Sequence, residues 1–341
     1  TILLSKNAKN SENFYSLLCL LIMLVKFNRL SEYGYDYIAQ FILLIVFHKI
    51  YFLNSKNIEV VKSILYFVLT VLIKPISLLF LPIMLFIIYK KYFLFYRIIP
   101  QSKYFLIFSL IIILFSSSFF KTGCVFYPLN NTCFSKENIS WSKKDSLKSY
   151  SEVVTLWAKG YWVQGDSKYE KINDKKIYNK DYNWLKFWIE KHFFYKVSEF
   201  LLIIIGSIIL IYIYFSKDKL AFERTNKQKL LILLLSLFSV LFWLNTVPQF
   251  RFGFSSIIIF TYLSFKYFLN LKIYFNKKKF FHLLILGLLV LNLKNINRIN
   301  SEFERNDFYK FKDFPFYNEK EIKYEYSNLK VKKFLHIEII E

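Results

Sequence analysis

Glycine, cysteine and histidine are all scarce in this 341-residue chain, which contains seven, three and four of them. With so few glycines the sequence has no glycine-serine linker, no P-loop and no dinucleotide-binding fingerprint. The serine-hydrolase motif GxSxG and the zinc-protease motif HExxH are missing as well. No second cysteine pair or nearby histidine completes a zinc site, so we expect no metal. These absences remove the common motifs of nucleotide-binding proteins, serine hydrolases and zinc enzymes.

Apolar side chains are abundant and come in blocks. Hydrophobic residues make up 55% of the chain and aromatic residues 21%. Nearly uninterrupted apolar runs occupy residues 105–120, 200–215 and 230–244. Runs close to the about 20 residues that cross a bilayer are typical of transmembrane helices. We therefore expect an all-α, polytopic membrane protein that has membrane lipids among its partners.

Nine apolar segments can be delimited, and two of them are separated only by Lys74 and Pro75. Proline lacks an N–H donor and disfavours helical backbone at the residue before it. One kinked helix and a hairpin of two short helices are both open, and we favour the hairpin because one continuous helix would be long for a single crossing. The segments are residues 14–27, 37–53, 61–73, 75–89, 104–120, 198–215, 230–247, 252–269 and 280–293.

The formal net charge is +23, and the basic residues are spread through loops instead of forming one domain. That distribution argues against nucleic-acid binding. Basic stretches at 89–103, 216–229 and 270–279 predict three cytoplasmic loops, because lysine and arginine accumulate on that side of membrane proteins. With the hairpin, residues 28–36 face outward; with one kinked helix they would face the cytoplasm.

The hairpin interpretation also divides the chain into four parts. The short turn at residues 245–251 then lies on the outer face, together with the Lys74–Pro75 turn and a large loop. The parts are N-terminal membrane helices (1–120), an extracytoplasmic loop with an interfacial helix (121–197), C-terminal membrane helices (198–293) and an extracytoplasmic tail (294–341).

Cys124 and Cys133 begin the large loop, nine residues apart. An oxidising outer compartment favours a disulfide between them, and the alternative is two unpaired structural thiols.

Five of the six tryptophans lie in this loop or at its border. We expect them mainly to anchor the loop at the membrane–water interface, although aromatic faces also stack on sugar rings. Residues 182–196 are expected to form an amphipathic helix lying on the membrane, with an apolar side made by Trp184, Phe187, Trp188 and Phe194.

Charged residues beside the apolar segments are the candidate site. Lys74 and Arg251 are expected to bind phosphate, because guanidinium suits bidentate recognition and both lie at outer turns. Snorkelling of Arg251 to the interface is the alternative. Asp36 and Glu32 are candidate general bases toward an acceptor hydroxyl, or groups that orient it.

The stretches "NRLSEYGYD", "KP", "TGCVFYP…TCF" and "PQFRFG" together resemble an uncharacterised group of bacterial multi-pass membrane proteins. That group is similar in architecture to GT-C glycosyltransferases, and the resemblance covers most of residues 28–255. It implies about nine helices with short hairpins, a large outer loop and a place in the bacterial inner (plasma) membrane.

The resemblance also implies a reaction. A sugar would pass from a polyprenyl-phosphate carrier to a cell-surface glycan or lipid, without a further cofactor. GT-C enzymes usually place their catalytic acid in the first outer loop, which here would precede Thr1 if the chain is a fragment, so Asp36 would be a supporting residue. The alternatives are an O-antigen polymerase or ligase, and a transporter or flippase of lipid-linked sugars.

Overall fold

The computed structural model describes most of the chain and divides it into two compact units, residues 1–285 and 286–341. Each unit is treated by itself below. The described residues are 10–26, 36–52, 57–91, 101–125, 127, 130–215, 227–269, 277–305, 331–334 and 337–340.

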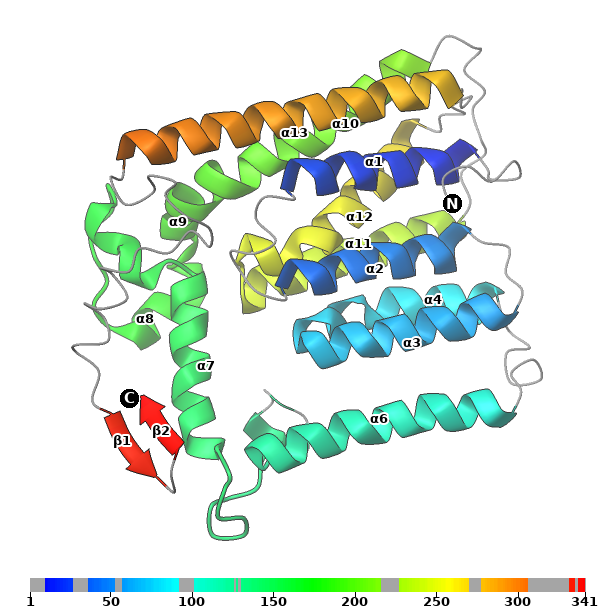
Figure 1. The fold of residues 1–341 in the computed structure, drawn as a ribbon. Coiled ribbons are helices and arrows are strands. Elements are labelled where there is room, and N and C mark those ends of the chain that lie inside the picture. The colour runs from blue at the N-terminus through cyan, green and yellow to red at the C-terminus, as the bar shows by residue number, and fades with distance from the viewer. Residues whose placement is uncertain are drawn as a thin grey trace. The chain divides into compact units, whose positions relative to one another are not determined.

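All nine predicted apolar segments fold as helices, and most of them run side by side in the first unit (Figure 1). Most helix ends differ from the predicted bounds by a few residues, because polar residues add a turn at several ends. Helix α13 is the exception, since it continues to Arg305, beyond the predicted end at residue 293. The elements made by these segments are α1 (Asn10–Lys26), α2 (Asp36–Phe52), α3 (Asn57–Ile73), η3 (Pro75–Phe80) with α4 (Leu81–Lys91), α6 (Gln101–Thr122), α10 (Ser198–Phe215), α11 (Lys227–Thr246), α12 (Phe250–Leu269) and α13 (Lys277–Arg305).

Three helices among the described residues are long and apolar enough to cross a membrane: Leu185–Phe215, Gln228–Thr246 and Lys278–Ser301. That is fewer than the nine expected. For α1, α2 and α3 the reason is length, because they have 17 residues each. At 1.5 Å per residue such a helix is about 26 Å long, slightly short of a bilayer core.

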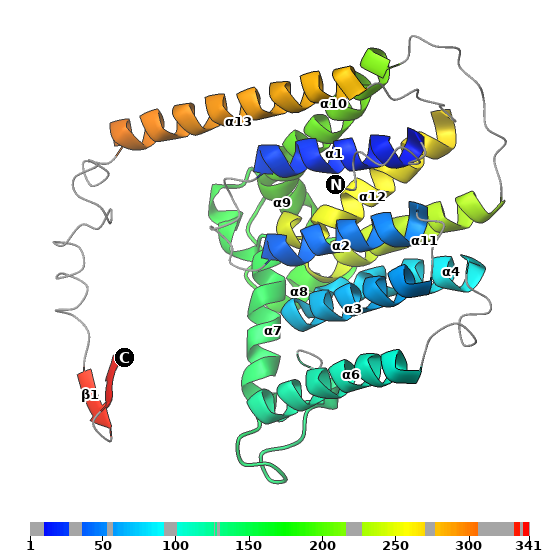
Figure 2. The same cartoon turned by 45° about the vertical axis from the view of Figure 1, so that its right-hand side comes forward.

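The chain reverses direction at Lys74, so the predicted hairpin is present and the kinked helix is not. Lys74 has extended backbone (φ −145°, ψ 108°), and Pro75 starts the 3₁₀ helix η3. From there α4 returns alongside α3, as both views show (Figures 1 and 2). The break arises because proline cannot donate the hydrogen bond that would continue α3.

Helix α2 is the centre of the first unit. Twelve of its 17 residues are buried, which is expected of a helix that is apolar all round and has neighbours on several sides. Its partners include α1, α3 and α12. Aromatic rings fill the space between them: Tyr15 of α1 contacts Phe47 of α2 and Tyr262 of α12, with ring centroids 5.3 and 4.9 Å apart.

The large loop is itself folded into short helices. It starts at the opposite end of the helices from the ends that flank the three basic stretches (Figure 1). Its elements are η4 (Asn130–Thr132), α7 (Lys144–Ala158), η5 (Tyr161–Asp166), α8 (Lys175–Asn179), η6 (Lys180–Tyr182), α9 (Leu185–Trp188) and the π-helix η7 (Ile189–Val197).

The expectation that residues 182–196 form a separate amphipathic helix on the membrane surface is wrong. Trp184, Phe187 and Trp188 are buried in the core, and Phe194 is exposed. Residues 185–215 form one unbroken helical stretch, so the segment is the first part of a bilayer-length helix. The aromatic side of this segment packs against protein, because the indole N–H of Trp188 donates to the backbone oxygen of Pro248 at 2.8 Å.

The second unit contains the last turns of α13 and a small antiparallel hairpin. Strand β1 (Val331–Phe334) pairs with β2 (Ile337–Ile340), and Val331 lies opposite Ile340. This hairpin is an exception to the all-α expectation within the described chain.

Two helical glycines give a matched test of the packing between α11 and α12. A Cβ added at Gly253 would lie 2.4 Å from the indole ring of Trp243, whereas one added at Gly206 would have nothing within 4 Å. We expect Gly253→Ala to lower the free energy of unfolding by about 1–3 kcal/mol, as overpacking does. Gly206→Ala should raise it by about 0.5–1 kcal/mol, because alanine favours the helix.

Thermal unfolding of both variants in the same detergent measures the difference. Equal melting temperatures for the two alanine variants would contradict the close approach of α12 to Trp243.

Candidate functional site

Three chain segments meet at Asp36, the first residue of α2. The second segment is the α3–η3 turn with Lys74, and the third is the start of α12 with Arg251. All three lie at the same end of the helices (Figure 1). A carboxylate in the first turn of a helix interacts favourably with the helix dipole. The reversal at Lys74–Pro75 and the short turn before α12 are therefore what bring the two cations to this carboxylate.

The two cations bind different oxygens of the carboxylate. Lys74 Nζ lies 2.5 Å from Asp36 Oδ1, and Arg251 Nε lies 3.2 Å from Asp36 Oδ2. Only 5% of the Asp36 side chain is exposed, against 35% of Lys74 and 22% of Arg251. The carboxylate is thus covered, while both cations keep part of their side-chain surface exposed.

Aromatic rings line the cations. The guanidinium carbon of Arg251 lies 5.1 Å from the ring centre of Trp157 and 5.0 Å from that of Phe252. Lys74 Nζ lies 5.7 Å from the Phe252 ring centre. Cations over aromatic faces are attracted by the ring quadrupole and are held in place. Trp157 belongs to α7, so the large loop contributes directly to the cluster of Asp36, Lys74, Arg251, Trp157 and Phe252, which we call the cation site.

A second polar contact repeats the geometry one helical turn further on. The side-chain oxygen of Gln40 accepts hydrogen bonds from the hydroxyl of Ser255 at 2.6 Å and from its N–H at 3.1 Å. Gln40 follows Asp36 by four residues, and Ser255 follows Arg251 by four. Residues four apart share a face of a helix, so α2 and α12 run in parallel with two matched polar contacts. All atoms of the second contact are buried.

The "PQFRFG" stretch owes its local shape to the residues around it. Gln249 offers its backbone oxygen to the indole N–H of Trp243 at 2.8 Å. Phe250 packs edge-to-face against Phe200 of α10 with ring centroids 4.4 Å apart. Gly253 leaves room for the Trp243 ring. These contacts fix the start of α12 and hence the direction of Arg251.

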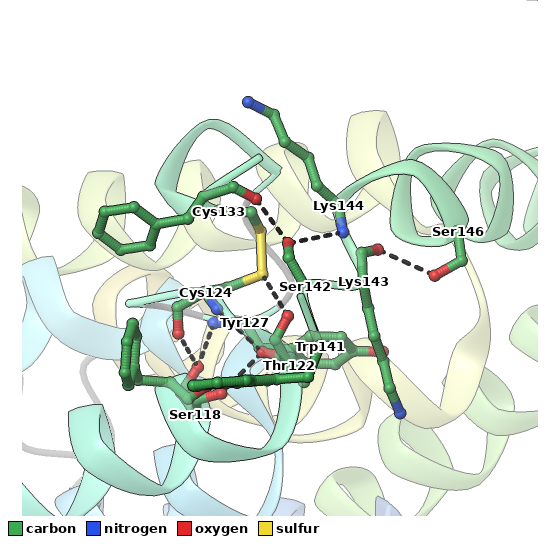
Figure 3. The surroundings of a disulfide bond; sticks show 12 residues. Ser118, Thr122, Cys124, Tyr127, Cys133, Trp141, Ser142, Lys143, Lys144 and Ser146 are labelled. Carbon is green, nitrogen blue, oxygen red and sulfur yellow. Dashed lines mark hydrogen bonds between the residues drawn. A yellow bond between two sulfur atoms is a disulfide. The ribbon is translucent and has the colours of Figure 1, made fainter. Parts of the chain in front are cut away.

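The structure joins Cys124 and Cys133 in a disulfide at the end of α6 (Figure 3). Ser118 of α6 donates a hydrogen bond to the backbone oxygen of Cys124 at 2.9 Å, and its own oxygen accepts from the N–H of Tyr127 at 2.8 Å. The disulfide therefore closes the first part of the loop on itself, and Ser118 ties that part to the last turns of α6. This arrangement stabilises the first part of the large loop and lies outside the cation site.

Two other buried ionisable residues, Lys159 and His48, lie outside the cation site and have their own partners. Lys159 is buried, donates to the side chain of Asn179 at 3.1 Å and lies over the Trp184 ring. Its burial lowers the pKa of the Lys159 ammonium below the usual value. His48 pairs with Glu12 at 3.4 Å, near the end of α2 that is remote from Asp36.

The structure therefore brings together three of the four predicted site residues, Asp36, Lys74 and Arg251. Glu32 lies outside the described residues. Sequence reasoning missed Trp157, Gln40 and Ser255. The matching four-residue spacings from Asp36 to Gln40 and from Arg251 to Ser255 were the signal for the last two. No sequence signal pointed to Trp157, because its contact with Arg251 depends on the tertiary fold.

Comparison with known proteins identifies a family. Residues 2–258 match the family described as Domain of unknown function (DUF8201), and the chain belongs to it. That match includes all members of the cation site and ends just after the Gln40–Ser255 contact. The searches of curated proteins and of solved structures each found no match.

We predict that loss of the Gln40–Ser255 contact destabilises the fold. Gln40→Leu removes the acceptor of a buried hydroxyl, so we expect the free energy of unfolding to fall by about 1–3 kcal/mol. Ser255→Ala should be milder, because the Gln40 oxygen keeps the N–H of residue 255. In the double variant the two losses should not add, since both single variants remove the same hydroxyl hydrogen bond.

Thermal unfolding of the single and double variants checks this. Ser109→Ala is the control, because the Ser109 hydroxyl bonds only a backbone oxygen of its own helix at 2.8 Å. Additive losses of stability would show that the Gln40–Ser255 contact does not stabilise the packing of α2 against α12.

Proposed function

We propose that the chain is a GT-C-like membrane glycosyltransferase that moves a sugar from a polyprenyl-phosphate carrier onto a cell-surface glycan or lipid. The observation that carries the proposal is the meeting of Lys74 and Arg251 at one covered carboxylate. Two cations from separate hairpins, both partly exposed, form a suitable site for a phosphate group. A lipid carrier would place its phosphate at this depth, next to the ends of the apolar helices.

The proposed step is a direct displacement. The acceptor hydroxyl oxygen forms a bond to the anomeric carbon, and the bond from that carbon to the phosphate oxygen breaks. The electron pair of the broken bond stays on the phosphate, where Lys74 and Arg251 stabilise the charge. The hydroxyl proton passes to a carboxylate base, for which Asp36 and Glu32 are the candidates. Asp36 contacts both cations, so its first role is to position them, and it can orient the acceptor from the same place.

Membrane placement is part of the proposal. Nine helices would lie in or against the bacterial inner membrane, with the short hairpin α3–η3–α4 entering it from the cytoplasmic side. The large loop would face outward together with the cation site. Support comes from the basic stretches, because the helix ends that flank them lie at the end remote from Asp36 (Figure 1).

The alternatives receive less support from particular residues. An O-antigen polymerase or ligase would rely on arginines of its outer loops, and residues 121–197 contain no arginine. A transporter would need ionisable residues near the middle of its spans. The Glu12–His48 pair instead lies within the first turn of α1 and the last turns of α2.

Topology can be tested by cysteine labelling in intact cells. Ser149 of α7 and Lys278 of α13 are both exposed and lie at opposite ends of the helices. With Ser149→Cys we expect labelling by a membrane-impermeant maleimide, because α7 belongs to the outer loop. With Lys278→Cys we expect labelling only after the membrane is permeabilised. The reverse pattern would place the cation site in the cytoplasm.

Function can be tested by replacing Arg251. In cells that depend on this protein for glycan extension, Arg251→Ala should lower the extension rate by about 10²–10³-fold, as loss of one charge-stabilising donor does. Arg251→Lys should recover only part of the activity, since lysine cannot bind phosphate through two parallel donors.

Lys180→Ala is the control, because Lys180 is a cation of the large loop with 76% of its side chain exposed, and it lies outside the cation site. Glycan length on gels and the amount of protein in membranes are the two measurements. Normal glycan with Arg251→Ala, at normal protein amount, would exclude the proposed role.

A further inference from the structure

In the cation site, the carboxylate of Asp36 already contacts the two cations that an incoming anion would bind. Asp36 contacts Lys74 through one oxygen and Arg251 through the other, at 2.5 and 3.2 Å. The three side chains carry two positive formal charges and one negative. An anion that binds Lys74 and Arg251 is attracted by both cations and repelled by the carboxylate between them.

The position of Asp36 gives this repulsion its strength. Its side chain is only 5% exposed, and charges shielded from water interact more strongly than charges on the surface. The residue also cannot easily move aside, because it is the first residue of a helix that is buried on most sides. The carboxylate therefore stays next to a bound phosphate.

We infer that Asp36 determines the charge selectivity of the cation site. It favours a phosphodiester, which carries one negative charge, over a phosphomonoester or diphosphate that carries about two. The inference rests on the proposed function, because it assumes that phosphate binds Lys74 and Arg251.

In the proposed reaction this selectivity separates substrate from product. A sugar linked through one phosphate to a polyprenyl chain is a phosphodiester. When the anomeric carbon–oxygen bond breaks, the electron pair stays on the phosphate and the carrier becomes a monoester with about −1.5 to −2 charge near neutral pH. Asp36 then repels the product more strongly than it repelled the substrate, which favours release of the carrier.

The test uses two short probes and the purified full chain in nanodiscs of uncharged lipid. Geranyl methyl phosphate is the diester probe, and geranyl phosphate is the monoester probe at about pH 8, where it carries nearly two charges. Wild type should bind the diester at least as tightly as the monoester. Asp36→Asn removes the repulsion at almost constant shape, so it should tighten monoester binding by at least about tenfold and diester binding by clearly less.

Two further variants keep the inference falsifiable. Asp145→Asn makes the same charge change at an exposed carboxylate of α7 and should leave the ratio of the two affinities unchanged. Lys74→Gln removes one positive charge from the cation site, so the monoester should lose more affinity than the diester. If Asp36→Asn does not fold, an unchanged affinity ratio in Lys74→Gln overturns the inference.

The outcomes separate the two proposals. If both probes bind wild type, and the ratio of their affinities in Asp36→Asn and in Lys74→Gln equals the wild-type ratio, Asp36 does not select charge. The proposed function then still stands. Equal weakening of both probes by Asp36→Asn would likewise assign Asp36 a purely structural role. If neither probe binds any variant, the phosphate site fails and the selectivity fails with it.

Discussion

The contact of one carboxylate with two cations is the constraint on which the arrangement of the first unit depends. Asp36 begins α2, Lys74 stands at the reversal between α3 and η3, and Arg251 lies in the first turn of α12. A buried carboxylate without partners would be strongly unfavourable, so these three segments have to end at the same place. Both cations keep part of their surface in contact with solvent, with 35% of the Lys74 side chain and 22% of the Arg251 side chain exposed.

The surrounding aromatic residues make this polar contact compatible with an apolar fold. Trp157 and Phe252 cover the guanidinium of Arg251, and Trp243 determines how closely α12 can approach α11. The large loop thereby becomes part of the site instead of a separate cover. The result is a small group of cations at the end of apolar helices.

Much of this could be predicted from the sequence, because it depends on local signals. Apolar runs located all nine helices, Pro75 marked the reversal, and charges beside apolar segments pointed to Asp36, Lys74 and Arg251. Their convergence followed once the basic stretches assigned the remaining turns to one side.

The rest depends on tertiary contacts that no local pattern records. Tryptophans at 184 and 188 look the same in sequence whether they face lipid or protein, and the structure buries both. The number of bilayer-length helices was overestimated, because apolar composition does not say whether a helix of 17 residues crosses or only enters the membrane. The contact between Trp157 and Arg251 joins residues 94 positions apart and appears only in the folded chain.

A cryo-EM structure of the protein in nanodiscs with a bound polyprenyl-phosphate sugar tests the phosphate site most directly. The account predicts phosphate density within hydrogen-bonding distance of both Lys74 Nζ and the Arg251 guanidinium, with Asp36 still beside them. Phosphate density elsewhere, with the Asp36–Lys74–Arg251 contacts closed and unoccupied, would contradict it.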